Sequence, residues 1–191
     1  MPGQFNSTLD VSPDGQELIF RTIDPRTGVD IWTLPLVGDR KARPLLATEA
    51  QEGGAAFSPD GRSLAYWSDE SGDVQVYVRR YPELDQKLRI SVAGTTGFSN
   101  PRLHLLQWRS DGRELVFLGS DFHTVFAVSI LPGEPLHAGP PRILFRLPAQ
   151  VVDVTMSPDA GRFYILVPDR AVERGAVRIL TQWWRGLDGQ P

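Results

Sequence analysis

Short apolar runs alternate along the whole chain with turns that are rich in glycine, proline and aspartate. The clearest example is the Ser-Pro-Asp-Gly sequence at 58–61, which is followed by Leu64-Ala65-Tyr66-Trp67. Proline presets its φ near roughly −65°, aspartate accepts hydrogen bonds from nearby amides, and glycine tolerates a positive φ. Apolar residues on both sides of such a turn predict a β-hairpin.

This turn occurs four times along the chain. In the third copy Arg109-Ser110 replaces Ser-Pro. Consecutive turn aspartates are 46, 51 and 48 residues apart. A period of roughly 40 to 50 residues carrying four short strands is typical of a β-propeller blade. The near-equal spacing indicates that these aspartates have a structural role. They are Asp14, Asp60, Asp111 and Asp159.

The expected strands are apolar at consecutive positions, as at 18–20, 64–67 and 115–118. Such strands are buried on both faces, as a blade is between its two neighbours. The sequence therefore predicts an all-β fold, a β-propeller of about four four-stranded blades, and no helix of useful length. A single propeller is expected over 1–187 and a carboxy-terminal tail over 185–191. The expected blades cover 5–46, 54–92, 105–146 and 151–184.

The fourth blade is expected to be incomplete, because no outer strand follows the segment 176–184. Closed propellers usually contain about four to eight blades. Two arrangements therefore remain open: a compact four-bladed ring, or an open segment of a six- or seven-bladed ring. We favour the open segment, whose unclosed blade edges could support self-association.

Composition limits the classes of partner. The 20 Lys and Arg residues against 23 Asp and Glu give a formal charge of −3, so nothing indicates a nucleic-acid or anionic-lipid surface. The absence of cysteine excludes disulfides and thiolate sites. No signal peptide is visible, and no apolar run approaches the roughly 20 residues of a membrane span. We expect no membrane insertion, and the compartment stays open.

No catalytic, cofactor or metal site is expected. The three histidines, His104, His123 and His137, lack metal-ligand spacing. The segment 97–101 only superficially resembles a nucleophile elbow, since it lacks the final glycine and the strand-to-helix setting. The turn aspartates lack the alternating oxygen ligands of a calcium loop.

Loops and edges are better candidates for function. Loops from an outer strand to the next inner strand gather around a propeller's central channel. Gln51, Glu52, Phe98 and Asn100 would then line a binding entrance, although these loops could also be simple connectors. Trp183 and Trp184 should point to opposite faces of their strand. One of them could anchor an edge interface, and core packing is the alternative.

The repeat at 58–66 resembles the WD-like propeller repeat of the TolB family, which also occurs in the propellers of prolyl oligopeptidase-like enzymes. The segments 76–82 and 108–117, and 162–166 together with 179–184, resemble the carboxy-terminal propeller of bacterial transmembrane serine/threonine kinases. Two departures are Thr181-Gln182, which replaces Leu-Asn, and an extra residue expected at 159–161. The catalytic motifs of the kinase are missing from the sequence.

The resemblance implies a non-catalytic sensor or interaction module that binds an unidentified protein or small ligand. It would allow an extracytoplasmic location if the module were attached to a membrane-spanning kinase. The alternative from another class is an accessory propeller that gates a prolyl-oligopeptidase-like hydrolase. A third hypothesis, an independently catalytic propeller hydrolase, is disfavoured by the scattered histidines.

Overall fold

The computed structural model describes residues 7–91, 105–131, 133, 135–148, 151–168 and 177–180. Every regular element in these residues is a β-strand, and none is a helix. The strands form four antiparallel sheets that follow one another along the chain. The predicted all-β fold of consecutive blades is confirmed.

The first two blades are four-stranded meanders in which each strand pairs with the next one. The first blade consists of β1 (Ser7–Val11), β2 (Glu17–Asp24), β3 (Gly28–Pro35) and β4 (Arg43–Leu46). The second blade consists of β5 (Glu52–Phe57), β6 (Ser63–Ser68), β7 (Gln75–Arg80) and β8 (Lys87–Arg89).

The third blade has one more strand than the sequence predicts. The extra strand is the short β12, which lies between β11 and β13 in the sequence and pairs with the end of β11. The third blade consists of β9 (Leu106–Trp108), β10 (Glu114–Leu118), β11 (Thr124–Leu131), β12 (His137–Ala138) and β13 (Arg142–Arg146). The described part of the fourth blade consists of β14 (Asp153–Met156), β15 (Phe163–Pro168) and β16 (Val177–Leu180).

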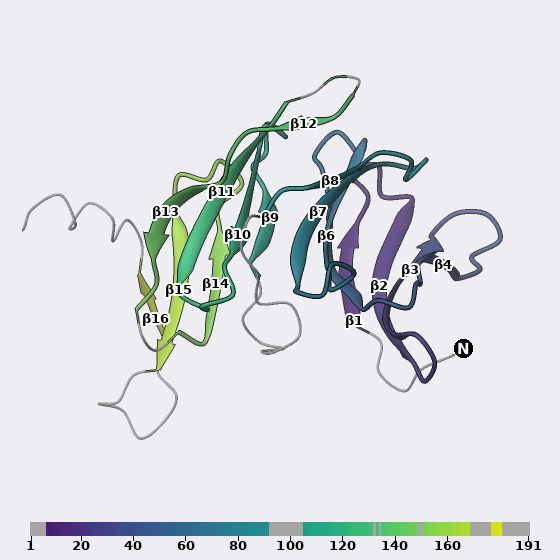
Figure 1. The fold of residues 1–191 in the computed structure, drawn as a ribbon, viewed down its shortest axis with the longest axis horizontal. Coiled ribbons are helices and arrows are strands. Elements are labelled where there is room, and N and C mark those ends of the chain that lie inside the picture. Colours follow the sequence, from purple (N-terminus) through teal and green to yellow (C-terminus); the bar gives the residue numbers. More distant parts are fainter. Residues whose placement is uncertain are drawn as a thin grey trace, which may run out of the picture.

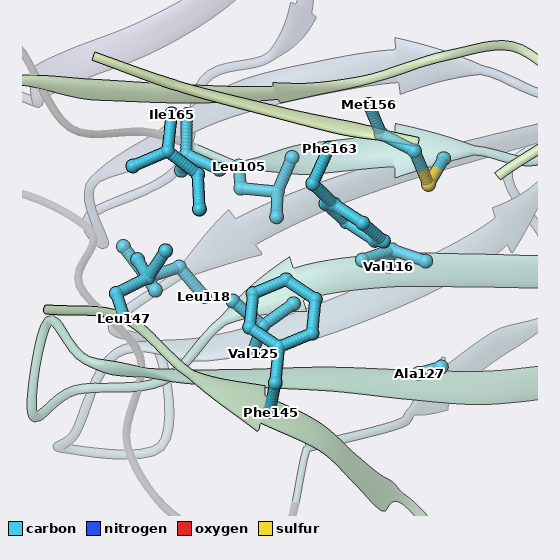
Figure 2. Packing of buried hydrophobic residues seen from close by; sticks show 11 residues of the cluster. Leu105, Val116, Leu118, Val125, Ala127, Phe145, Leu147, Met156, Phe163 and Ile165 are labelled. Carbon is cyan, nitrogen blue, oxygen red and sulfur yellow. The ribbon is translucent and has the colours of Figure 1, made fainter. Parts of the chain in front are cut away.

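The blades stand side by side in an arc (Figure 1), with the first and fourth at its opposite ends. In the described residues the sheets do not close into a ring, as expected for an open segment. Apolar clusters fill the seams between neighbouring blades. Figure 2 shows the third seam, where Phe163 and Ile165 of β15 point toward the third blade. The rings of Phe145 and Phe163 meet edge to face with centroids 4.6 Å apart.

The repeated turn closes in the same way in three blades. In the second, the Ser58 hydroxyl donates to Asp60 Oδ1 over 2.6 Å and accepts the Ser63 amide over 2.8 Å. Gly61 takes a φ of +70°, which is a left-handed conformation that favours glycine. These bonds stay within the turn, so Asp60 has the structural role that the repeat predicted.

The fourth turn corrects the expectation of an extra residue at 159–161. Its closing bond runs from the Ser157 amide to the Arg162 carbonyl over 2.9 Å. This span of five residues is the same as from Ser58 to Ser63. Ala160 occupies the glycine position with a φ of +55°. The turn therefore has the ordinary length, and an alanine takes the left-handed position.

Each seam is also bridged at the same point of its inner strands. In the first seam the Phe57 amide donates to Asp10 Oδ2 over 2.9 Å. In the third, the Met156 amide donates to Gln107 Oε1 over 2.8 Å. The equivalent residue of the second blade is Ala56, which has no side-chain acceptor. There the indole Nε1 of Trp108 donates to the Ala56 carbonyl over 3.1 Å.

Candidate functional site

Gln51 and Glu52 lie where the outer strand of the first blade leads to the inner strand of the second. The Gln51 amide donates to Asp69 Oδ1 over 2.8 Å, which fixes the loop against the end of β6. Glu52 is only 2% exposed, and its Oε1 accepts a hydrogen bond from the Thr48 hydroxyl. A role for these two residues in binding stays a prediction.

Glu52 and Asp30 are two buried carboxyl groups at this end of the first seam. Within the described residues, Glu52 Oε2 and Asp30 Oδ1 have no hydrogen-bond partner. Burial raises the pKa of Glu52, and the charges of Asp30 and Asp69 raise it further. Burial also raises the pKa of Asp30. The ionised forms of these carboxyls are therefore destabilised here.

The other predicted site residues lie outside the described residues. They are Phe98 and Asn100 of the channel loops, and Trp183 and Trp184 of the terminal strand. His104 is also outside them. His137 lies in β12, and His123 lies in the turn between β10 and β11, so the structure does not bring these two into one strand or turn. Among the described residues, no group of His, Cys, Asp and Glu is arranged to hold a metal ion.

Two clefts open on the side of the molecule that carries the repeated turns. The first, of about 630 Å³, lies between the turns of the first and second blades. Its wall contains three carboxylate residues, Asp14, Glu17 and Asp60, together with Tyr81, and no lysine or arginine among the lining residues that the structure describes. We call it the acidic cleft.

The second cleft, of about 600 Å³, lies between the turns of the second and third blades. Its wall contains Arg62, Arg80 and Arg113, as well as Asp60 and Asp111. We call it the basic cleft. Both volumes are in the range of small-ligand and short-peptide sites.

The carboxylates of the acidic cleft are already satisfied by the protein. Asp14 Oδ1 accepts the Ser12 hydroxyl over 2.6 Å and the Gln16 amide over 3.0 Å. These bonds, that of the Ser12 hydroxyl first, lower the pKa of Asp14. Glu17 Oε1 accepts the Thr33 hydroxyl over 2.6 Å, and its Oε2 accepts the Tyr81 hydroxyl.

The cations of the basic cleft are less fully engaged. Arg80 is paired with Asp85. In the part of the chain that the structure describes, no ion pair within 4.0 Å is found for Arg62 or Arg113. Two guanidinium groups therefore lie in the wall of this cleft without an ion pair to any carboxylate that the structure describes.

Sequence reasoning missed these arginines, although a signal was present. The residue after the turn glycine is Gln16 in the first repeat, Arg62 in the second and Arg113 in the third. Aligning the repeats by their turn aspartates would have placed the two arginines at equivalent positions on neighbouring blades. Arg80 comes from the end of β7. Only the pairing of Ser63 with Arg80 brings it to the side of the blade where the turn with Arg62 lies.

No helix of the described residues is long and apolar enough to cross a membrane. No protein-family model matches the chain.

Solved structures with the same fold include two TolB proteins. TolB from Acinetobacter baumannii is similar with a TM-score of 0.62 and 15% identity, over 93% of this chain and 43% of that one. A putative TolB from Agrobacterium tumefaciens is similar with a TM-score of 0.57 and 20% identity, over 84% of this chain and 57% of that one. The chain thus spans about half the length of these structures.

Enzymes occur among the similar structures as well. A structure from a study of two prolyl endopeptidases matches with a TM-score of 0.50 and 8% identity, over 85% of this chain and 26% of that one. At these identities the likeness concerns the fold alone. The fold is a TolB-like β-propeller arrangement, with its sheets in an open arc.

Proposed function

We propose that this chain is a non-catalytic propeller module that binds a protein or a ligand. The observation that carries the proposal is the basic cleft, a hollow of about 600 Å³ at a blade seam with two arginines for which no ion pair is found among the described residues. A concave site with a few convergent polar groups is the usual form of a binding site. The TolB-like fold is compatible with this role and does not require a reaction.

A finer proposal is that the module is the sensor or interaction region of a bacterial receptor-type serine/threonine kinase. It is supported by the resemblance of the segments 76–82 and 108–117 to the carboxy-terminal propeller of such kinases. A propeller attached in this way to a membrane-spanning kinase would be located outside the cytoplasm.

The binding role is tested with the purified ¹⁵N-labelled chain. Amide shifts are recorded against a panel of peptides and small anions, and the same mixtures are assayed for hydrolysis products. The expected result is a saturable shift with at least one probe, no product, and perturbed amides near one of the clefts. Turnover by the chain, lost in His123→Ala, would contradict the non-catalytic assignment. A panel without any binder would contradict the binding assignment.

An accessory propeller that gates a prolyl-oligopeptidase-like hydrolase is the second candidate, favoured by the likeness to the prolyl endopeptidase structure. The genomic reading frame distinguishes the two. An upstream kinase domain with a membrane span is expected under the first proposal. A hydrolase domain downstream would support the second one.

A further inference from the structure

We propose that the basic cleft binds an extended acidic peptide in which carboxylate and apolar side chains alternate. This inference rests on the proposed binding function and names the ligand class and the site. It places the peptide between the turns of the second and third blades, on the side of the molecule opposite the loop that carries Gln51 and Glu52.

Charge is the first argument. The guanidinium groups of Arg62 and Arg113 come from equivalent positions of two neighbouring turns, and within the described residues neither has an ion pair. The two aspartates in the wall are partly engaged by other groups: Asp111 lies 3.4 Å from Arg109, and Asp60 Oδ1 accepts the Ser58 hydroxyl. The charge of Arg62 also acts on Asp60 and contributes to its lowered pKa, but no ion pair within 4.0 Å joins the two. Two separated guanidinium groups suit a ligand with at least two carboxylates, because arginine pairs with carboxylates in a bidentate manner.

The apolar part of the wall is the second argument. Trp108 and Ile130 are almost fully buried at 8% and 4% exposure, and Leu136 is half-buried beside them. The Trp108 indole is fixed by its hydrogen bond to the Ala56 carbonyl. The Leu136 amide is held by Gln86 Oε1 over 2.9 Å. A ligand with apolar groups between its carboxylates would therefore meet mainly the half-buried Leu136, which packs on the fixed Trp108 and Ile130 beneath it.

The size and position of the cleft favour a peptide. A volume of about 600 Å³ is that of a site for a drug-sized ligand, so only a short segment of a peptide would lie within it. The cleft lies between the turns of two adjacent blades, so a chain that crosses the seam would contact both turns. Arginine clusters are a recurring means of recognising acidic segments.

The test measures fluorescence anisotropy of a labelled, blocked hexapeptide in which glutamate alternates with leucine and phenylalanine. Peptides in which glutamine or lysine replaces glutamate are the ligand controls. The glutamate peptide should bind the full chain in a saturable way, and its affinity should fall as salt rises. The glutamine and lysine peptides should bind about tenfold more weakly or worse.

The site is tested with the double variant Arg62→Ala/Arg113→Ala. Its matched control is Arg146→Ala, which removes an exposed arginine of the third blade outside the cleft. The double variant should lose about tenfold in affinity or more, whereas the control should stay within about twofold. Arg62→Lys/Arg113→Lys keeps the charge and should retain an intermediate affinity. Circular dichroism and the melting temperature confirm that each variant is folded.

Three results would overturn the inference. Equal binding of the glutamine peptide would exclude recognition of carboxylates. Equal losses in the double variant and in Arg146→Ala would indicate non-specific charge attraction. Competition by free glutamate or inorganic phosphate at the affinity of the peptide would indicate a simple anion site. If another probe still binds the chain, the proposed binding function survives although the acidic-peptide inference fails. The failure of one proposal can therefore be distinguished from the failure of the other.

Discussion

The acidic and basic clefts are built from the same repeat, at equivalent seams, yet they have opposite properties. In the acidic cleft the carboxylates of Asp14 and Glu17 are satisfied by hydroxyl and amide donors of the same chain. In the basic cleft Arg62 and Arg113 have no ion pair within the described residues. Polar bonds cross both seams, from the Tyr81 hydroxyl to Glu17 in the first and from the Leu136 amide to Gln86 in the second. The seams differ in the charged groups of their turns, whose carboxylates are satisfied in the first and whose arginines have no ion pair among the described residues in the second. Under the proposed function, the same repeat serves structure at one seam and binding at the next.

The largest expected effect comes from Gly54→Ala at the other end of the first seam. Gly54 has a φ of +56°, and a Cβ there would lie 2.0 Å from Trp67 Nε1. The free energy of unfolding should fall by about 3 kcal/mol, because the strained backbone and the displaced ring act together. Urea denaturation checks this value.

The matched control is Gly72→Ala. Gly72 also has a positive φ, +95°, but a Cβ would meet no atom within 4 Å. Gly72→Ala should lower the free energy of unfolding by only about 1 kcal/mol, because it adds the unfavourable backbone conformation without a clash. Equal losses in the two variants would show that Trp67 does not pack against Gly54 as the structure has it.

The hydroxyl of Tyr81 tests whether the acidic cleft is structural. Tyr81→Phe removes the donor to Glu17 Oε2 and leaves the ring packed edge to face on Phe57. Because a partly buried carboxylate loses a partner, we expect a loss of about 1 to 2 kcal/mol in unfolding free energy. Binding of the acidic peptide should not change. If Tyr81→Phe were as stable as the wild type, the conclusion that the polar groups of the acidic cleft stabilise the fold would be wrong.

The sequence predicted the fold well and the site poorly, for physical reasons. Turn chemistry is local, so Pro59, Asp60 and Gly61 identify a hairpin without any knowledge of the rest of the chain. The seams depend on which residues of different blades meet. Nothing near Trp108 in the sequence indicates that its indole N–H donates to the Ala56 backbone carbonyl, at the point where the other two seams have a side-chain acceptor. The strand β12 was missed because only two residues pair.

Glu52 gives the seam that contains the acidic cleft a dependence on pH. Its pKa is raised above the ordinary value of 4.5, first by burial. The native state therefore holds this proton more tightly than the unfolded chain, and the stability contributed by the protonated form is lost as pH rises through the folded pKa. Glu52→Gln removes the ionisation and should gain about 1 kcal/mol at pH 8.

The measurement is the melting temperature of the wild type and of Glu52→Gln between pH 4 and pH 8, taken as roughly the range over which buried carboxyls titrate. The advantage of the variant should grow as pH rises. Asp14 has the opposite effect on the pH dependence of stability. Its pKa is lowered in the folded state, so its contribution to stability disappears on acidification. A constant difference between Glu52→Gln and the wild type at all pH values would contradict the burial of the charged group.

The smallest effect is expected in the fourth turn, where Ala160 takes the position that glycine occupies in the other three. Its φ of +55° compares with +71°, +70° and +69° at Gly15, Gly61 and Gly112. Ala160→Gly should raise the free energy of unfolding by about 0.5 to 1 kcal/mol, since relief of the left-handed strain exceeds the added entropy of the unfolded chain. Gly61→Ala is the reverse change at an equivalent turn and should destabilise by a similar amount. If both variants destabilised the protein, the two turns would differ in conformation, and the repeat that relates the clefts would not extend to the fourth blade.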